Sequence, residues 1–403
     1  MSTSLLYHGF GLRGYTHRRT DFVDGCVVFT AEPSGGELRC SGCGGGEVRR
    51  EGGVARRWRT TPIGGKPVFV DTTVPRVWCA SCGKTRQVEI GFAERRVSYT
   101  RAFERYALEL SRSMTIQDVA HHLGVSWDVI KDIQKRHLER RFKHIRLKDL
   151  TQIAIDEISV GKGHRYLTVV LDLLSGAVVF IGDGKGADAL NPFWRKLRAS
   201  GARIEAAASD MSAAYLMALA ENLPDAVHVL DRFHVMKLYN DKLAQLRRDL
   251  QRTAEADQQE VIKGTRWLLL KNPENLDDTR NERRRLDKAL ELNQPLATAY
   301  YMKEDLRQLW EQRSKPAAER FLDRWIAKAQ ASGVRMLIKF ARTLQLHRRG
   351  LLAWYDYRIS TGPLEGTNNK IKTMQRQAYG YRDPTFFRLK IHAIHEATYA
   401  LIG

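Results

Sequence analysis

Apolar and polar positions alternate near the N-terminus, and the period then becomes helical. Residues 56–63 and 66–78 alternate apolar with polar side chains, which predicts strands. From 91 to 148 apolar residues recur at helical spacing. The change of period predicts a boundary between a strand-rich segment and a helical segment near residue 90.

Short apolar runs begin again at residue 150. Three of them, at 150–159, 166–176 and 177–184, are separated by tight turns and predict an antiparallel meander. Two further strands, at 203–210 and 226–234, alternate with helices. The order β-β-β-α-β-α-β predicts a mixed sheet covered by helices.

The C-terminal half is predicted to be mainly helical. Between residues 235 and 350, Leu243, Leu246 and Leu250 share one helical face, and long charged stretches fit exposed helix surfaces. The segment 361–403 then predicts a helix, a turn and a final helix.

The net charge of the chain indicates what kind of partner it binds. The 403 residues include 66 Lys and Arg against 46 Asp and Glu, a net charge of +20 spread along the chain. This favours nucleic acid over a small anionic substrate, with a ribosome-associated or merely basic soluble protein as the alternative. Apolar runs fall short of the roughly 18 residues that cross a bilayer, and the N-terminus lacks the order of a signal peptide. We expect three or four folding units in a cytosolic protein with no membrane partner.

Four of the five cysteines form two CxxC pairs, each followed by glycine. The pairs are Cys40 with Cys43 and Cys79 with Cys82, and predicted strands join them. This spacing predicts a zinc ribbon with one structural Zn²⁺, with redox motifs or chance spacing as the alternative. Cys26 stands apart and is expected in the core.

Residues 115–134 have the layout of a helix-turn-helix. Gly124 is placed to make the turn, and Ser126 to cap the second helix. The basic segment that follows favours DNA binding over an ordinary helical hairpin. The residues expected near the leading face of the second helix are Ser126, Trp127, Asp128 and Lys131.

Three aspartates, Asp156, Asp210 and Asp231, directly follow apolar strand segments. Acids at the carboxyl ends of strands face the crevice where open α/β sheets bind ligands. If Asp156 and Asp210 lie on adjacent strands, their carboxylates can converge, and Glu365 on a late helix could pack across that edge. Each acid taken alone could instead cap a helix or end a turn.

Clustered carboxylates repel one another unless cations bind between them. Oxygen ligands suit Mg²⁺ or Mn²⁺. Two such ions about 4 Å apart can activate an attacking oxygen and stabilise a leaving oxygen at a phosphodiester. These acids therefore predict two-ion phosphodiester chemistry.

The helix that carries Glu365 can start at Thr361 or Gly362, with Pro363 in its first turn. On a face where an acid is followed by cationic side chains, the cations could bind a DNA backbone next to metal ions held by the acid. The alternative is a solvated polar face with no such role. The residues that share this face are Glu365, Asn369, Lys372 and Arg376.

Together these motifs resemble bacterial insertion-sequence transposases of the DDE type, specifically the ISL-three family. The resemblance extends over essentially the whole chain. It rests on the CxxC pairs, the helix-turn-helix and the segments IDEIS, KGHRYLTVVLD, SDMSAAY, DRFHVMKL and GPLEGTNNKIKTMQRQAYGYRD.

The resemblance implies a ribonuclease-H-like catalytic domain whose metal-binding triad is Asp156, Asp210 and Glu365. It also implies a helical insertion before the glutamate helix, which accounts for the long separation of Glu365 from Asp210. Glu157 is left out of the triad because a continuing strand points it away from Asp156.

Other roles follow from the same resemblance. Asp231 and His234 form a D-x-x-H motif similar to one in related transposases, in which His234 would contact the scissile phosphate or orient a metal ligand. A structural histidine is the alternative. Lys372 resembles a lysine that contacts the transposon end. Trp267, in the insertion, is expected in the core, with stacking on an unpaired base as the alternative.

The predicted architecture is multidomain α/β. Its segments are a zinc ribbon at 1–90, a helix-turn-helix at 91–148, the catalytic domain at 149–240, a helical insertion at 241–350, and the rest of the catalytic domain at 351–403.

The predicted function is a transposase that binds terminal inverted repeats and uses two divalent ions to cleave DNA and transfer strands to target DNA. A homodimer is expected because two ends must be joined. In a bacterium it would be cytoplasmic and nucleoid-associated. The alternatives are a regulator with an inactive transposase domain and a structure-specific nuclease.

Overall fold

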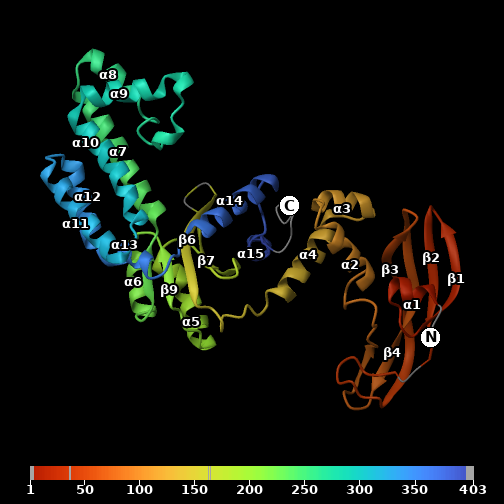
Figure 1. Cartoon of the computed structure of the whole chain (residues 1–403). Coiled ribbons are helices and arrows are strands. Elements are labelled where there is room, and N and C mark those ends of the chain that lie inside the picture. Colours follow the sequence, from red (N-terminus) through yellow and green to blue (C-terminus); the bar gives the residue numbers. More distant parts are fainter. Residues whose placement is uncertain (1–3, 36–37, 162, 164, 396–403) are drawn as a thin grey trace. The chain divides into compact units, whose positions relative to one another are not determined.

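The computed structural model describes residues 4–35, 38–161, 163 and 165–395 (Figure 1). The chain divides into two compact units. Unit 1 consists of Met1–Lys143 together with Met374–Gly403, and unit 2 is His144–Thr373. The five predicted segment bounds stay predictions.

Unit 1 is built on a five-stranded sheet of order β1-β2-β4-β3, with β5 paired to β4. The antiparallel β3–β4 hairpin spans the segments predicted as strands, and Trp58 is paired with Val70 in its register. Both of these side chains are fully buried, which gives the sheet its apolar face. The strands are β1 (Tyr15–Val23), β2 (Cys26–Pro33), β3 (Val48–Ile63), β4 (Lys66–Cys79) and β5 (Lys84–Gln87).

The predicted helix-turn-helix is confirmed as α3 and α4. Thr115 caps α3 by accepting from the Asp118 N–H, and Gly124 ends it with a φ of +61°, where glycine is favoured. Ser126 is at the N-cap position of α4, as predicted, but its side chain makes no capping hydrogen bond. The helices of unit 1 are α1 (Leu5–Phe10), α2 (Arg101–Leu110), α3 (Ile116–Leu123), α4 (Trp127–Arg141) and α15 (Pro384–His392).

Unit 2 contains the predicted mixed sheet, in the order β10-β9-β6-β7-β8. β6, β7 and β8 form the antiparallel meander, whereas β9 and β10 run parallel to β6. The strands are β6 (Gln152–Gly161), β7 (Arg165–Asp172), β8 (Val178–Asp183), β9 (Ala206–Ser209) and β10 (Val227–Leu230). The helices within this part are η1 (Ala187–Leu190), α5 (Asn191–Ser200) and α6 (Ala213–Asn222).

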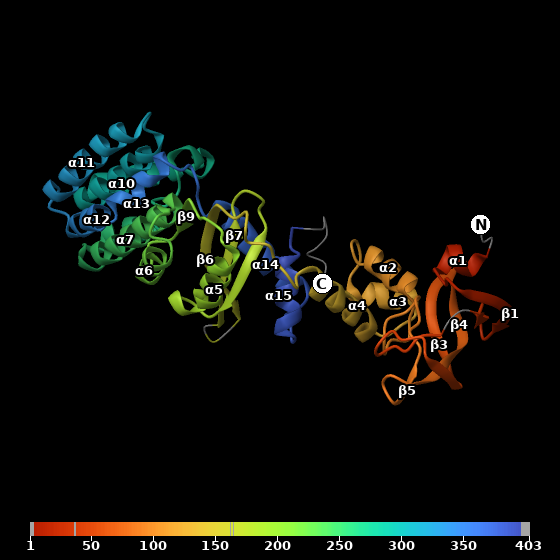
Figure 2. The same ribbon diagram turned by 90° about the horizontal axis from the view of Figure 1, so that it is seen from below.

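The segment between β10 and the glutamate helix is helical, as predicted. Tyr239, Trp325 and Phe340 form an edge-to-face aromatic cluster in its core, where α10 and α12 lie alongside α7 (Figure 2). The helices are α7 (Arg232–Thr253), α8 (Ala256–Lys263), η2 (Pro273–Asn275), η3 (Asp278–Arg280), α9 (Glu282–Leu292), α10 (Gln294–Arg307), η4 (Gln308–Glu311), α11 (Lys315–Ala331), α12 (Arg335–Leu346), α13 (Arg348–Leu352) and η5 (Ala353–Tyr355), followed by α14 (Gly362–Gln377).

Three expectations from the sequence need correction. Trp267 is 64% exposed rather than part of the core. Cys26 is only partly buried, because it opens β2 beside a turn. Asp156 does not end its strand, since β6 continues to Gly161. None of the described helices is long and apolar enough to span a bilayer.

Candidate active site and DNA-binding elements

Three aspartates lie at the same level across unit 2: Asp156 is within β6, and Asp210 and Asp231 directly follow β9 and β10. The parallel register of β6 and β9, continued by two residues, sets Asp156 opposite Asp210. The register of β9 and β10, continued by one residue, sets Asp210 opposite Asp231, whose main-chain N–H donates to Ser209 O at 3.1 Å. Neighbouring strands are about 4.8 Å apart, so the topology brings together acids that are distant in sequence.

Asp156 and Glu157 face opposite sides of the sheet. Glu157 Oε1 accepts from the Tyr215 hydroxyl of α6 at 2.8 Å and from the Gly186 N–H at 3.1 Å. Asp156 Oδ2 accepts instead from Asn368 of α14 at 2.9 Å. Glu157 is therefore occupied with packing α6, while Asp156 faces the glutamate helix.

Two hydrogen bonds join α14 to the acid-bearing edge. Thr361, just before the helix, donates from Oγ1 to Asp231 Oδ2 at 2.7 Å, and both residues are buried. Asn368, two turns further on, holds Asp156. Glu365 lies between these anchors, half-buried in the first turn of α14, with its main-chain N–H bonded to Thr361 O at 2.8 Å.

The electrostatic surroundings of Asp156 are those of a crowded acidic site. Burial raises its pKa above the usual value, and the nearby charges of Asp210 and Glu157 act in the same direction. A hydrogen bond from the Glu157 main chain and the charge of His234 act in the opposite direction. The influence of Asp210 and His234 places both groups within electrostatic reach of the Asp156 carboxylate.

The three acids are not drawn into one tight cluster. Among the residues that the structure describes, only the four cysteines form a group of three or more potential ligand atoms that all lie within 4.8 Å of one another. One Mg²⁺ with oxygen ligands at about 2.1 Å needs these atoms within roughly 4.2 Å of each other. The ligand oxygens of Asp156, Asp210 and Glu365 therefore do not all lie within reach of a single Mg²⁺ in this structure.

One further observation fits a cation beside Asp156. Asn368 Oδ1 is buried and accepts no hydrogen bond from any residue in the described part of the chain. A buried carbonyl oxygen without a donor is uncommon and is a suitable ligand for a hard cation or its bound water. Asn368 is not among the residues predicted from the sequence, although its spacing of three residues from Glu365 places it near that residue on a helix.

The other residues predicted on α14 lie on its outer side. Asn369, Lys372 and Arg376 are exposed, whereas Asn368 is buried. The predicted stripe therefore divides into the half-buried Glu365 and an outer part, Asn369, Lys372 and Arg376, that is open to solvent. Contact of the outer part with DNA stays a prediction.

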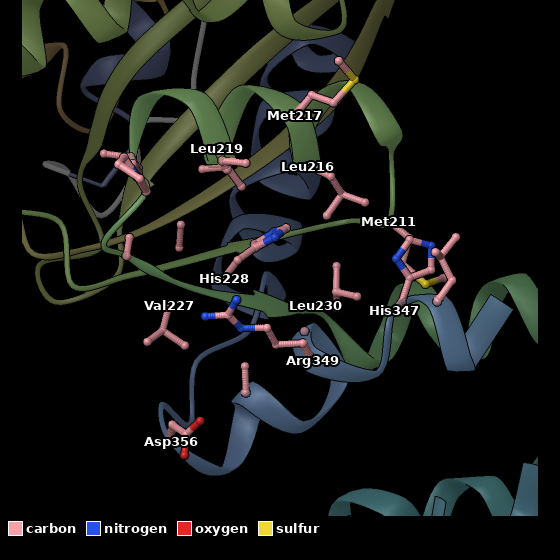
Figure 3. A pocket seen from close by; sticks show the side chains of 18 of the residues that line it. Met211, Leu216, Met217, Leu219, Val227, His228, Leu230, His347, Arg349 and Asp356 are labelled. Atoms are coloured by element: carbon pink, nitrogen blue, oxygen red, sulfur yellow. The ribbon is translucent and has the colours of Figure 1, made fainter. Parts of the chain in front are cut away.

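A pocket of about 720 Å³ lies on the β10 side of the sheet, between α6 and α13 (Figure 3). Its lining is largely apolar and includes His228 and His347, but none of the candidate catalytic acids. Burial, reinforced by His347, lowers the pKa of His228 to about 4. Ser209 Oγ donates to Asp210 O at 2.9 Å, so the neutral His228 ring donates to Ser209 Oγ, 2.8 Å away. His228, on the wall of this pocket, thus helps to hold the main chain at Asp210 through Ser209.

The four predicted cysteine ligands converge in unit 1. The Sγ atoms of Cys40 and Cys82 are 3.9 Å apart, and those of Cys43 and Cys79 are 3.6 Å apart. Four sulfurs about 2.3 Å from one tetrahedral Zn²⁺ lie about 3.8 Å from each other, whereas a disulfide needs about 2.05 Å. Main-chain hydrogen bonds from Cys43 and then Gly42 lower the pKa of Cys40 to about 6, which favours the thiolate that zinc requires. The cluster is a structural zinc site.

The predicted recognition face of α4 is partly engaged within unit 1. Trp127 is 42% exposed, and Lys131 Nζ lies 5.5 Å from the centre of its ring. Asp383, before α15, pairs with Lys131 at 3.4 Å and with Lys135 at 2.8 Å. Lys131 therefore has a carboxylate partner that sequence spacing could not reveal.

Three family profiles match the chain, one for each kind of element. The profile described as "Transposase", of the DDE type in family ISL3, matches residues 153–391. The "Helix-turn-helix domain of transposase family ISL3" matches 88–138. The "zinc-finger of transposase IS204/IS1001/IS1096/IS1165" matches 37–82.

Curated relatives match over nearly their whole length. The "Transposase for insertion sequence element IS1001" of Bordetella parapertussis is 33% identical over 396 residues, which cover 95% of this chain and 96% of that protein. The "Transposase for insertion sequence element IS1557" of Mycobacterium tuberculosis is 30% identical over 392 residues, covering 90% and 87%. A solved structure, "Drosophila P element transposase strand transfer complex", is 12% identical with a TM-score of 0.37 over 76% of this chain and 94% of that one, a similarity too low to add to the argument.

The zinc ribbon, the helix-turn-helix and the mixed sheet with its matching profile define a DDE transposase, an enzyme that cleaves and joins DNA. DNA is accordingly its partner. The chain belongs to the transposase family ISL3, the ISL-three family of the sequence resemblance.

Proposed function

We propose that unit 2 performs its chemistry at the acid-bearing edge of a ribonuclease-H-like sheet, with Asp156, Asp210 and Glu365 as ligands of two divalent ions, Mg²⁺ or Mn²⁺. The register that sets Asp156 opposite Asp210 carries this proposal. The hydrogen bond between Asn368 and Asp156 supports the place of Glu365 in it, because it holds the glutamate helix at the same edge. When bound, the two ions supply the positive charge that activates the attacking oxygen and stabilises the leaving oxygen of a phosphodiester.

The side chains would position the DNA around this edge. His234, in the first turn of α7 and within electrostatic reach of Asp156, is proposed to contact the scissile phosphate. Asn369 and Lys372, exposed on the outer side of α14, would contact the DNA backbone. Water would attack the phosphorus and the bond to the 3′ oxygen would break, which leaves a 3′-hydroxyl and a 5′-phosphate. The 3′-hydroxyl would then attack a phosphorus of the target DNA, and the target P–O3′ bond would break.

The DNA acted on is proposed to be the ends of an insertion sequence. The two curated relatives are named as transposases for insertion sequence elements, and this chain matches nearly their full lengths. The zinc ribbon and helix-turn-helix would bind the terminal inverted repeats, in part through Ser126, Trp127 and Lys131. Two protomers would act together, since two ends are joined.

Cleavage of end-containing DNA by the wild type and by Asp156→Asn tests the proposal. The expected result is cutting at the element ends that needs Mg²⁺ or Mn²⁺ and is lost in the variant, with end binding retained. End binding without cutting by the wild type would favour a regulator. Cutting of branched DNA whatever its end sequence, without strand joining, would favour a structure-specific nuclease.

A further inference from the structure

Asn368 combines three features that a residue serving only to pack α14 would not need. It is 6% exposed, its Nδ2 donates to Asp156 Oδ2 at 2.9 Å, and its Oδ1 is buried without a hydrogen-bond donor among the described residues. The nitrogen and the oxygen of this side-chain amide therefore differ in their contacts. The nitrogen is bonded to a candidate metal ligand, and the oxygen has no donor among the described residues.

This arrangement matches the needs of a crowded acidic site. Without cations, an amide N–H that bonds Asp156 holds the carboxylate in place and offsets part of the repulsion from Asp210. With a cation bound, an amide oxygen adds a hard ligand and no further negative charge. A fourth carboxylate at the same position would increase the repulsion in the cation-free protein.

The position of Asn368 on the helix makes the arrangement possible. It follows Glu365 by three residues, which places the buried Asn368 beside the half-buried Glu365 on α14, whereas Asn369 is exposed. α14 is held at its start by the bond between Thr361 and Asp231. The amide is therefore carried by an anchored helix rather than by a loop.

We propose that Asn368 belongs to the divalent-cation site: its Nδ2 holds Asp156 in the cation-free protein, and its Oδ1 helps to ligate the cation beside Asp156. This inference rests on the proposed function, because it assumes that a cation binds at Asp156. It goes beyond the three acids by adding a neutral oxygen ligand from the glutamate helix.

Mn²⁺ binding to the full-length protein without DNA tests the inference, measured by isothermal titration or by the loss of the free-Mn²⁺ electron paramagnetic resonance signal. Asp156→Asn identifies the binding event that belongs to this site. Asn368→Ala is expected to weaken that event roughly 10- to 100-fold, the size seen when residues supporting a metal site are removed. Gln377→Ala, at an exposed position near the end of α14, is the control and is expected to leave this event unchanged.

Asn368→Asp separates a ligand role from a packing role. An aspartate keeps the size of the side chain and supplies oxygen, so it is expected to bind Mn²⁺ at least tenfold more tightly than Asn368→Ala while melting at a lower temperature than the wild type without the ion. Mn²⁺ binding as weak in Asn368→Asp as in Asn368→Ala would contradict the ligand role.

Two outcomes distinguish failure of this inference from failure of the proposed function. If the wild type shows an Asp156-dependent event that Asn368→Ala leaves unchanged, the inference is wrong and the proposed site stands. If no Mn²⁺ event depends on Asp156, the proposed site itself is wrong, and the inference fails with it.

Discussion

Thr361 Oγ1 donates a hydrogen bond of 2.7 Å to Asp231 Oδ2, which joins the first residue after β10 to the residue just before α14 across 130 positions. The helical segment leaves the sheet at Asp231 and returns at Thr361. This buried bond therefore closes the base of the helical segment and sets where the glutamate helix begins.

Loss of that bond should destabilise unit 2. A buried hydrogen bond to a charged group contributes about 1.5–3 kcal/mol, so Thr361→Val should lower the free energy of unfolding by about that amount. Thr373→Val on the same helix is the matched control, because Thr373 donates only to Asn369 O within the helix and should change stability by less than about 0.5 kcal/mol. Equal losses in the two variants, measured by urea unfolding, would contradict the anchoring role.

Trp267 should matter for DNA and not for folding. Its ring is 64% exposed with the Arg266 guanidinium 4.6 Å from its centre, a pair suited to stacking on an unpaired base. Trp267→Ala should leave the free energy of unfolding within about 0.5 kcal/mol but weaken binding of end DNA with an unpaired base by about 1–3 kcal/mol. The buried Trp325→Ala should instead cost about 3–5 kcal/mol of stability. Unchanged binding of such DNA by Trp267→Ala would exclude stacking.

Zinc binding should depend on the four clustered cysteines and not on Cys26. Native mass spectrometry is expected to find one Zn²⁺ per chain, lost in Cys82→Ser because three sulfurs leave the tetrahedral site incomplete. Cys26→Ser is the control, since Cys26 bonds only weakly to Asp24 O at 3.6 Å and lies outside the cluster. End-DNA binding should fall with the zinc. A variant of Cys26 that loses zinc, or a variant of Cys82 that keeps it, would contradict the assignment.

His228 should make the protein less stable in mild acid. Its pKa is about 4 in the folded protein and about 6.5 when unfolded, so the unfolded state binds more protons between these values and stability falls as pH is lowered. From pH 7.5 to pH 5 this group alone should cost about 2 kcal/mol. His228→Gln keeps a donor for Ser209 but does not titrate, so the decrease in unfolding free energy over that range should shrink by about this amount. An unchanged pH dependence would show that His228 is not buried in its neutral form.

Local patterns in the sequence predicted most of the fold. CxxC spacing, strand alternation and the Gly124 turn identified the zinc ribbon and the helix-turn-helix, because each depends on residues close together in the chain. The strand order predicted a mixed sheet. Contacts between distant residues were missed, including the carboxylate of Asp383 beside Lys131.

The hydrogen bond between Asn368 and Asp156 was missed for the same reason. A helical stripe at spacings of 4, 3 and 4 selected Asn369, but the side of α14 that faces the sheet depends on the anchor at Thr361, which selects Asn368. Trp267 was assigned to the core because leucines follow it. Of these, Leu268 and Leu269 are buried while the tryptophan points outward, and an apolar run does not reveal that division.

Strand transfer with pre-cleaved ends and Mg²⁺ tests the central claim most directly, because it isolates the chemical step. Wild type and Glu365→Gln are compared, with the exposed neighbour Gly366→Ala as a control for changes to the helix. Glu365→Gln should bind the ends normally and join them to target DNA at least roughly a hundredfold more slowly, since it removes one charged ligand of the proposed ions. Strand transfer by Glu365→Gln at the wild-type rate would contradict the claim that Glu365 completes the site formed with Asp156 and Asp210.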